Sequence, residues 1–304
     1  MSSTSEIREQ QTAAANASQP NVSGSNSSRA GKSSWSLWTR QTLAIMRLEI
    51  RKNFLSRRAL LLYLIAGSPL GLLSLFALFR MPTDDAGNFG ELSIVYAAIY
   101  GGLILRTLVF FGCAWVFMNL FRGEVVDRSL HYYFLAPVRR EVLVVGKYLS
   151  GLIATVLLFS ITTVGSMSIL YFSLYPSESA RFFFDGAGAG QMLAYLGVTI
   201  LACVGYGAVF LLVGLFFRNP IIPGLLLYGW EWLNFLLPPL LKKLSVIHYL
   251  QSLVPVSMPE GPFAVLVEPT PAWISVPSLL LFTGVVLFLA SLHIRRMEIS
   301  YAGD

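Results

Sequence analysis

The fold of this chain is decided by residues 192–217, which read MLAYLGVTILACVGYGAVFLLVGLFF. The stretch contains no charged residue, and at 1.5 Å per residue a helix of this length crosses the roughly 30 Å hydrocarbon core of a bilayer. Only helices and closed barrels satisfy their backbone in lipid. Barrel strands are about ten residues long with alternating polarity, whereas this stretch is apolar on every face, so it predicts a membrane-spanning helix.

Similar apolar runs recur along the whole chain. Of its 304 residues, 55% are hydrophobic and 12% are charged, where a soluble domain carries about 25% charged residues. The mean hydropathy is +0.64. We therefore expect an all-α polytopic membrane protein with six transmembrane helices over Leu60–Phe79, Ile94–Phe121, Leu149–Tyr175, Met192–Phe217, Ile221–Leu241 and Ile274–Ile294.

The basic residues predict the orientation of these helices. The net charge is +6, but Lys and Arg lie beside the apolar runs rather than on one soluble face, which favours membrane orientation over nucleic-acid binding. With both termini in the cytoplasm, the outer segments hold only Arg80, Arg181, Lys242 and Lys243. The positive-inside rule therefore places both termini inside.

The two ends of the chain differ from the apolar runs. Residues 1–34 are rich in Ser, Asn, Ala and Gln, which predicts a disordered polar tail without a cleavable signal peptide. Residues 35–58 alternate basic and apolar, and we expect an amphipathic interfacial helix with Trp38, Ile45, Leu48 and Leu55 opposite a basic stripe of Arg40, Arg47, Arg51 and Arg58. The alternative is a solvated basic linker. Residues 297–304 are expected to be a short cytoplasmic tail.

Residues that could carry chemistry are few and scattered. Cys113 and Cys203 lie in apolar runs, and His131, His248 and His293 have no ligand spacing, so we expect no metal site. The segment 30–34, Ala-Gly-Lys-Ser-Ser, resembles the end of a phosphate loop, but position 26 is Asn and no strand precedes it. We therefore expect no ATP site in this chain and no enzymatic activity.

Two ionisable residues fall inside apolar runs, Arg106 and Glu231. Counted from the cytoplasmic ends, they lie at heights of roughly 22 and 18 Å, so they could form a buried ion pair or line a substrate path. The alternative is that Arg106 reaches the outer interface and Glu231 faces an outer vestibule.

Two connections between the runs are long. In segment 122–147, Val126, Leu130, Tyr133 and Phe134 share one helical face, Glu124 and Arg128 have the spacing of an i,i+4 ion pair, and Pro137 ends the helix. Outer segment 242–273 contains five prolines among apolar residues, so we expect short helices that dip into the outer leaflet or cap the spans.

Residues 121–141, FRGEVVDRSLHYYFLAPVRRE, followed by Gly146-Lys147-Tyr148, resemble the cytoplasmic segment of ABC-2-type exporter permeases. That family has an acidic residue, Arg-Ser/Thr-Leu, a short apolar stretch, Pro-x-Arg/Ser-Arg, and Gly-Lys opening the third span. The resemblance in layout covers residues 37–296. The long tail, Arg106 and the small outer segment depart from the family pattern, which leaves the substrate class open.

The resemblance implies a permease subunit of an ABC transporter, an exporter in the bacterial inner membrane. It implies a separate ATPase subunit that binds ATP and Mg, and a second permease copy or a pseudo-symmetric partner. The residues expected to couple the permease to that ATPase are Glu124, Arg128, Leu130, Tyr133, Leu135, Pro137, Arg139, Arg140 and Lys147. The alternatives are an ion- or proton-coupled secondary transporter and a membrane-embedded enzyme or assembly factor.

Overall fold

The computed structural model describes residues 42–43, 46–47, 49–50, 57–79, 89–126, 140–217, 219–256 and 270–296. At positions 57–58, 122–126, 140–141, 177, 239 and 295–296 it describes the backbone alone. The chain divides into two compact units, Met1–Gln41 and Thr42–Asp304, and all described residues belong to the second. Regular structure within the described ranges is entirely helical, so the predicted all-α fold is confirmed.

Five helices are long and apolar enough to cross a membrane. They are α3 (Arg57–Phe79), the continuous helix formed by α4 (Phe89–Ala98), the π-helix η1 (Ile99–Val109) and α5 (Phe110–Val126), then α7 (Arg140–Leu174), α9 (Gly188–Phe216) and α13 (Ala272–Arg296). Large apolar side chains stay exposed on their outer faces, for example Leu64 at 68% and Leu281 at 71%, as expected where lipid replaces water. The chain is therefore a multi-pass membrane protein, as the sequence predicts.

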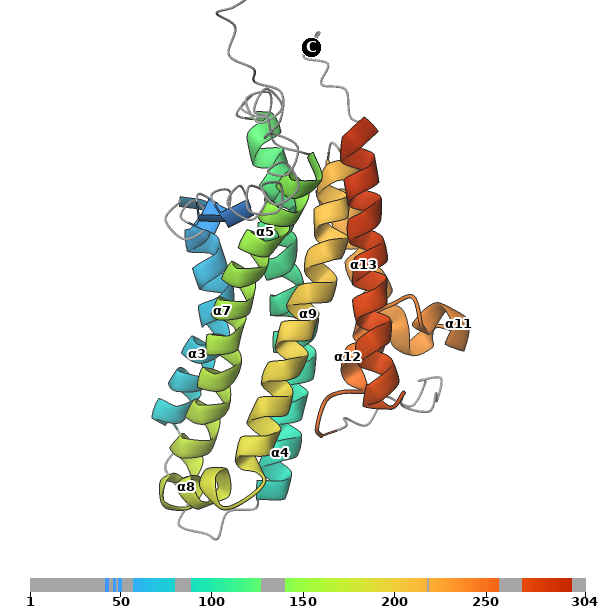
Figure 1. Ribbon diagram of the computed structural model, residues 1–304. Helices are drawn as coiled ribbons and strands as arrows, with labels where there is room; N and C mark the ends of the chain where they lie inside the picture. The colour runs from blue at the N-terminus through green and yellow to red at the C-terminus, as the bar shows by residue number, and fades with distance from the viewer. Residues whose placement is uncertain are drawn as a thin grey trace, which may run out of the picture. The chain divides into compact units, whose positions relative to one another are not determined.

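The long helices pack around α9, which lies between α5, α7 and α13 (Figure 1). Glycine permits the closest approach. A Cβ added at Gly214 of α9 would lie 2.9 Å from the Cα and the carbonyl oxygen of Met118 in α5. Close backbone contact through small residues is the usual basis of helix association in lipid, because the hydrophobic effect does not drive helices together there.

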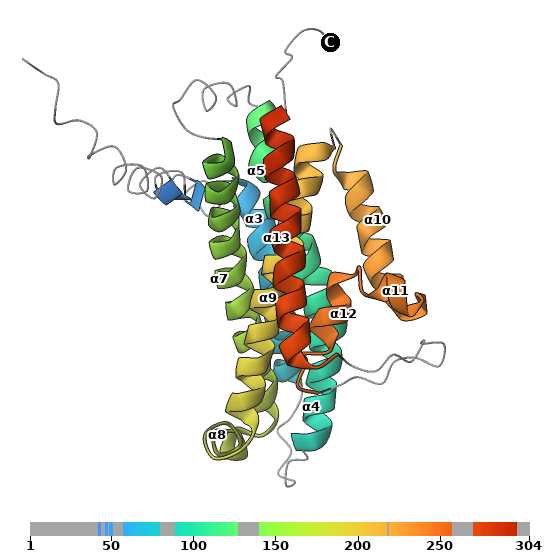
Figure 2. The ribbon, with the colours of Figure 1, turned by 45° about the vertical axis from the view of Figure 1, so that its right-hand side comes forward.

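The predicted fifth span, 221–241, is wrong as a single helix. It consists of α10 (Ile221–Trp232), the 3₁₀ turn η2 (Leu233–Leu236) and α11 (Pro239–Lys242), and α12 (Val246–Gln251) follows. The backbone turns extended at Leu237 and Pro238, where ψ reaches 146° and 156°. Pro238 and Pro239 cause the break because proline lacks the N–H that would continue the helix. Figure 2 shows α10 descending apart from the bundle and α12 lying beside α13. Six continuous spans are therefore not confirmed.

Helix ends gather at two opposite ends of the bundle. α3 begins, α5 ends, α7 begins and α13 ends at one of them, called here the α5/α7 end (Figures 1 and 2). The short helix α8 (Pro176–Phe184) lies at the other, the α8 end. The second and third long helices thus open onto the α5/α7 end, where residues 127–139 connect them.

Candidate functional site

Lys147 lies inside α7 at the α5/α7 end, because α7 begins at Arg140 rather than at the predicted Leu149. The side chain is fully buried. Its Nζ lies 2.6 Å from Oε1 of Glu49, donates a hydrogen bond to the Leu120 carbonyl at 3.0 Å, and sits 5.2 Å from the centroid of the Phe121 ring. We call these four residues the Lys147 cluster. It joins three stretches of chain that lie far apart in sequence.

The Lys147 cluster is held together by a buried ion pair. Glu49 is only 2% exposed, so the ion pair is dry. Removing one partner of such a pair leaves an uncompensated buried charge, which costs about 3–5 kcal/mol. The stretch before α3, the end of α5 and the start of α7 are therefore held together at the place where the 127–139 connection leaves and rejoins the bundle.

Most of the predicted coupling residues lie outside the described part of the chain. These are Arg128, Leu130, Tyr133, Leu135, Pro137 and Arg139. Glu124 falls in α5 and Arg140 opens α7, each with its backbone alone described. Of the predicted set, Lys147 is the residue whose side-chain contacts the structure gives.

The predicted interfacial helix is described at six positions only. Residues 42–43, 46–47 and 49–50 are helical. Arg47 is exposed, whereas Arg40 and Arg51 lie outside the described residues and Arg58 is described by its backbone in α3. The basic stripe therefore stays a prediction. Glu49, which the sequence did not single out, pairs with Lys147.

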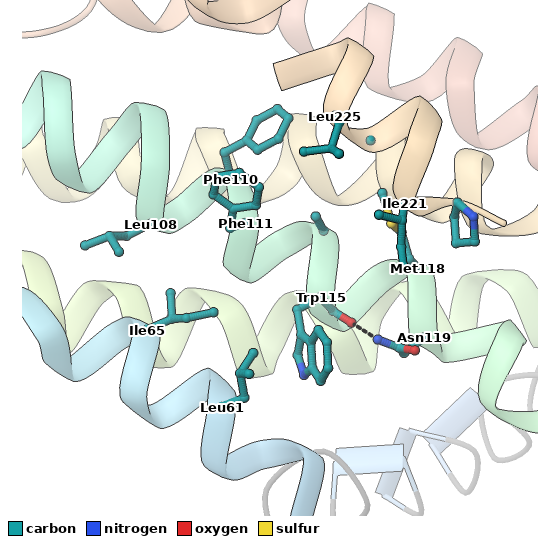
Figure 3. Close-up of a pocket in the computed structure, with 13 residues that line it drawn as sticks. Leu61, Ile65, Leu108, Phe110, Phe111, Trp115, Met118, Asn119, Ile221 and Leu225 are labelled. Carbon is teal, nitrogen blue, oxygen red and sulfur yellow. Dashed lines mark hydrogen bonds between the residues drawn. The ribbon is translucent and has the colours of Figure 1, made fainter. Parts of the chain in front are cut away.

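A groove of about 650 Å³ lies between α3, α5 and α10 (Figure 3). We call it the α10 groove. Its lining residues are Leu61 and Ile65 of α3, Leu108 of η1, Phe110, Phe111, Ala114, Trp115, Met118 and Asn119 of α5, and Pro220, Ile221, Gly224 and Leu225 around α10. The one amide among them, Asn119, donates to the Trp115 carbonyl at 2.7 Å. The groove is thus suited to an apolar molecule.

α10 covers this groove with little packing of its own. Of its twelve residues, only Gly224 and Glu231 are buried. Ile221, Ile222, Leu225 and Leu226 are each more than half exposed. An element with few buried contacts opens at low free-energy cost. Few buried side chains therefore hold α10 to the rest of the described structure.

Glu231 fixes the far end of α10. Its Oε1 accepts the Val246 N–H at 3.0 Å, and its Oε2 accepts the Ile247 N–H and the Ser245 hydroxyl at 2.9 Å each and the Tyr206 hydroxyl at 3.2 Å. Two of these donors are free N–H groups at the start of α12, so the carboxylate caps that helix. Glu231 thereby ties α10 to both α12 and α9.

A second cavity, of about 260 Å³, lies along the later part of α10, at Leu227, Trp230 and Glu231. Tyr206 and Phe282 also line it, and Phe110 borders both cavities. α10 therefore borders unfilled space along both of its halves and has an anchor at Glu231.

Arg106 and Glu231 form no ion pair in the described part of the chain. There the ion pair within 4.0 Å is Lys147–Glu49. The Nε of Arg106 has no hydrogen-bond partner among the described residues. The structure therefore gives no support to the pairing hypothesis, and it assigns Glu231 to other donors.

The π-helix η1 is a feature that the sequence reasoning missed. Within it the Thr107 hydroxyl donates to the Gly102 carbonyl five residues earlier. π-helical turns are rare and occur often at functional sites. The Gly101-Gly102 pair near its start is the available sequence signal, and a glycine pair by itself does not predict a π-helix.

The sequence reasoning also missed a buried polar network near the α8 end. The Tyr100 hydroxyl lies 2.9 Å from that of Thr199, which lies 3.0 Å from the Thr163 hydroxyl. One helical turn before it, the Tyr96 hydroxyl donates to the Thr163 carbonyl at 2.9 Å. These bonds join the second, third and fourth long helices and make this end of the bundle a rigid unit.

The sequence matches no protein-family model and no curated protein.

Proposed function

We propose that this chain is the membrane subunit of an ATP-driven transporter, an exporter whose ATP-hydrolysing subunit is a separate chain that docks on segment 122–147. The observation that carries the proposal is the Lys147 cluster. A partner that moves residues 127–139 would pull on α5 and α7 together, because Lys147 bonds the Leu120 carbonyl and Glu49 from inside α7.

The helices on both sides of that segment are suited to transmit such a movement. α5 continues to Val126 and α7 starts at Arg140, so each end of the 127–139 connection is joined directly to a long helix. Helices are stiff, and packed interfaces switch between discrete arrangements rather than deforming continuously. A displacement at the α5/α7 end would therefore reach the α10 groove, which α5 lines.

The α10 groove supplies the substrate path in this proposal. It is lined mainly by apolar side chains and is covered by α10, most of whose residues are not buried. As in the permeases that the sequence resembles, two copies of the chain would work together in the bacterial inner membrane. The exposed apolar residues of α10 beside the groove would then face the second copy.

Site-specific photocrosslinking tests the docking surface. A photoreactive phenylalanine analogue at position 133 should capture a P-loop ATPase in intact host cells, identified by mass spectrometry. The same analogue at Phe184, which is 87% exposed on α8, is the control and should capture none. Capture of the same ATPase from both positions, or from neither, would refute docking on segment 122–147.

A proton-coupled carrier is the second candidate, because the carboxylate of Glu231 lines the 260 Å³ cavity. In that case Glu231→Gln should abolish substrate movement driven by a pH gradient in liposomes that contain this chain alone. An ATP-driven transporter should show no such movement without its ATPase.

A further inference from the structure

Glu231 is a buried carboxylate whose described partners are all neutral. Its two oxygens accept four hydrogen bonds, and every donor is an N–H or hydroxyl group without charge. In the part of the chain that the structure describes, the ion pair within 4.0 Å joins Lys147 to Glu49, so no described Lys, Arg or His pairs with Glu231. A buried charge of this kind is costly unless a cation compensates it. Glu231 therefore leaves room for a cation from outside these residues.

Aromatic rings form much of the wall of the 260 Å³ cavity that Glu231 lines. Five of the ten lining residues are aromatic, namely Phe110, Tyr206, Phe210, Trp230 and Phe282. The Phe110 ring lies 5.3 Å from that of Tyr206 and 4.8 Å from that of Phe210 between centroids, with 73° and 86° between the ring planes. Rings at such steep angles resemble the walls of a box rather than a stack. The faces of aromatic rings attract cations, and the indole of tryptophan does so most strongly.

The remaining wall of this cavity decides which kind of cation fits. Its other lining residues are aliphatic, apart from Glu231 itself, and Arg106 is not among them. Glu231 already accepts about as many hydrogen bonds as its two oxygens have lone pairs. A metal ion or a primary ammonium would lose its water here and find few new hydrogen-bond partners. A quaternary ammonium has no N–H to satisfy, and its alkyl groups suit an apolar wall.

We propose that this cavity binds a quaternary ammonium group, with the aromatic rings around its alkyl groups and the Glu231 carboxylate as its counter-charge. The inference goes beyond the proposed transport function and does not depend on it. A volume of about 260 Å³ lies just below the range of drug-sized sites, about 300–1,000 Å³, so it suits a small group of this kind. Leu244, one of the lining residues, is 61% exposed, which places the surface of the described structure at the cavity.

Binding of radiolabelled choline to the purified full chain in maltoside micelles tests the inference. The comparison ligand is the uncharged isostere of choline, in which a tert-butyl group replaces the trimethylammonium group. Choline binding should be saturable, and the isostere should compete roughly tenfold more weakly or worse, because it has the shape but neither the cation–π attraction nor the charge. This comparison uses the wild-type chain, so it decides even where a variant does not fold.

Two pairs of variants locate the site. Glu231→Gln should remove most of the preference for choline over the isostere, whereas Asp185→Asn, an exposed carboxylate beyond α8, should keep it. Trp230→Leu should weaken choline binding about fivefold and the isostere less, because the leucine fills space without a ring face. Trp273→Leu changes a tryptophan that is 76% exposed and lines neither cavity, so it should bind choline like wild type.

Phosphatidylcholine added to the micelles separates the two sources of such a group. Competition with choline that is lost in Glu231→Gln identifies a lipid headgroup as the ligand, whereas undiminished choline binding identifies a free cation. Both outcomes support recognition of a quaternary ammonium at Glu231.

Three results would overturn the inference. They are no saturable choline binding, equal affinity of the wild-type chain for choline and its isostere, and equal weakening of both ligands by Trp230→Leu. None of these measurements involves an ATPase. A chain that binds choline but no ATPase would refute the proposed ATP-driven function alone, and the reverse result would refute this inference alone.

Discussion

At the scale of single residues, two buried charges hold the described structure together in different ways. Lys147 pairs with a carboxylate, and Glu231 is surrounded by neutral donors. Both charges need their partners, because an ion in a low-dielectric interior is costly without compensation.

For the ion pair, we expect Glu49→Gln and Lys147→Met each to lower stability by about 3–5 kcal/mol, since each leaves one buried charge unmatched. The double variant should recover most of that loss. Thermal unfolding of the four proteins in detergent measures the coupling as a double-mutant cycle. Additive losses in the double variant would show that the two side chains do not interact.

For Glu231, we expect Ser245→Ala and Tyr206→Phe each to cost about 1 kcal/mol, the net value of one hydrogen bond. Glu231→Leu should cost more than both together, because it leaves the Val246 and Ile247 N–H groups of α12 unpaired. Asp185→Asn, an exposed carboxylate beyond α8, is the control. A Glu231→Leu protein as stable as the control would contradict the capping role.

At the scale of helices, α9 depends on small residues where it meets α5. In Gly214→Ala the new Cβ would lie 2.9 Å from backbone atoms of Met118, so one helix must shift. We expect a loss of about 1–3 kcal/mol, the usual cost of overpacking. Gly197 in the same helix has nothing within 4 Å of an added Cβ, so Gly197→Ala should be neutral or slightly stabilising. Equal melting temperatures of the two variants would contradict the close α5–α9 contact.

The long helices could be predicted because each is a long run of apolar residues, which lipid allows only as a helix. The run 221–241 is apolar as well, and hydropathy cannot distinguish α10 followed by short helices from one span. Its Pro238-Pro239 pair was the available signal. The hydrogen bonds of a π-helix span five residues instead of the four of an α-helix. The amino-acid composition of residues 99–109 does not distinguish the two.

The candidate site was predictable only in part. Arg106 and Glu231 stand out because charges inside apolar runs are rare, and Lys147 was singled out through the resemblance to permeases. Their partners could not be predicted. Glu49 lies 98 residues from Lys147, and no local pattern links residues so far apart. The α10 groove depends on how α10 leaves the bundle, which is a property of tertiary packing.

At the scale of the whole unit Thr42–Asp304, α3 begins and α13 ends at the same end of the bundle (Figures 1 and 2). Together with the positive-inside rule, this predicts that α8 faces outward. Cys113 and Cys203 are buried, so introduced cysteines can be labelled selectively. In intact spheroplasts an impermeant maleimide should label Asp185→Cys, and it should label Gly303→Cys only after permeabilisation. Labelling of both positions without permeabilisation would exclude this topology.

Co-purification of the full chain with a P-loop ATPase from its own membrane tests whether this chain is the membrane subunit of an ATP-driven transporter. The ATPase should remain bound through detergent extraction, and its ATP hydrolysis should depend on this chain. Arg139→Glu/Arg140→Glu should release the ATPase, whereas Arg181→Gln should not. A chain that purifies without an ATPase, or a double variant that keeps its ATPase bound and fully coupled, would show that the chain is not such a subunit or that the ATPase does not dock on segment 122–147.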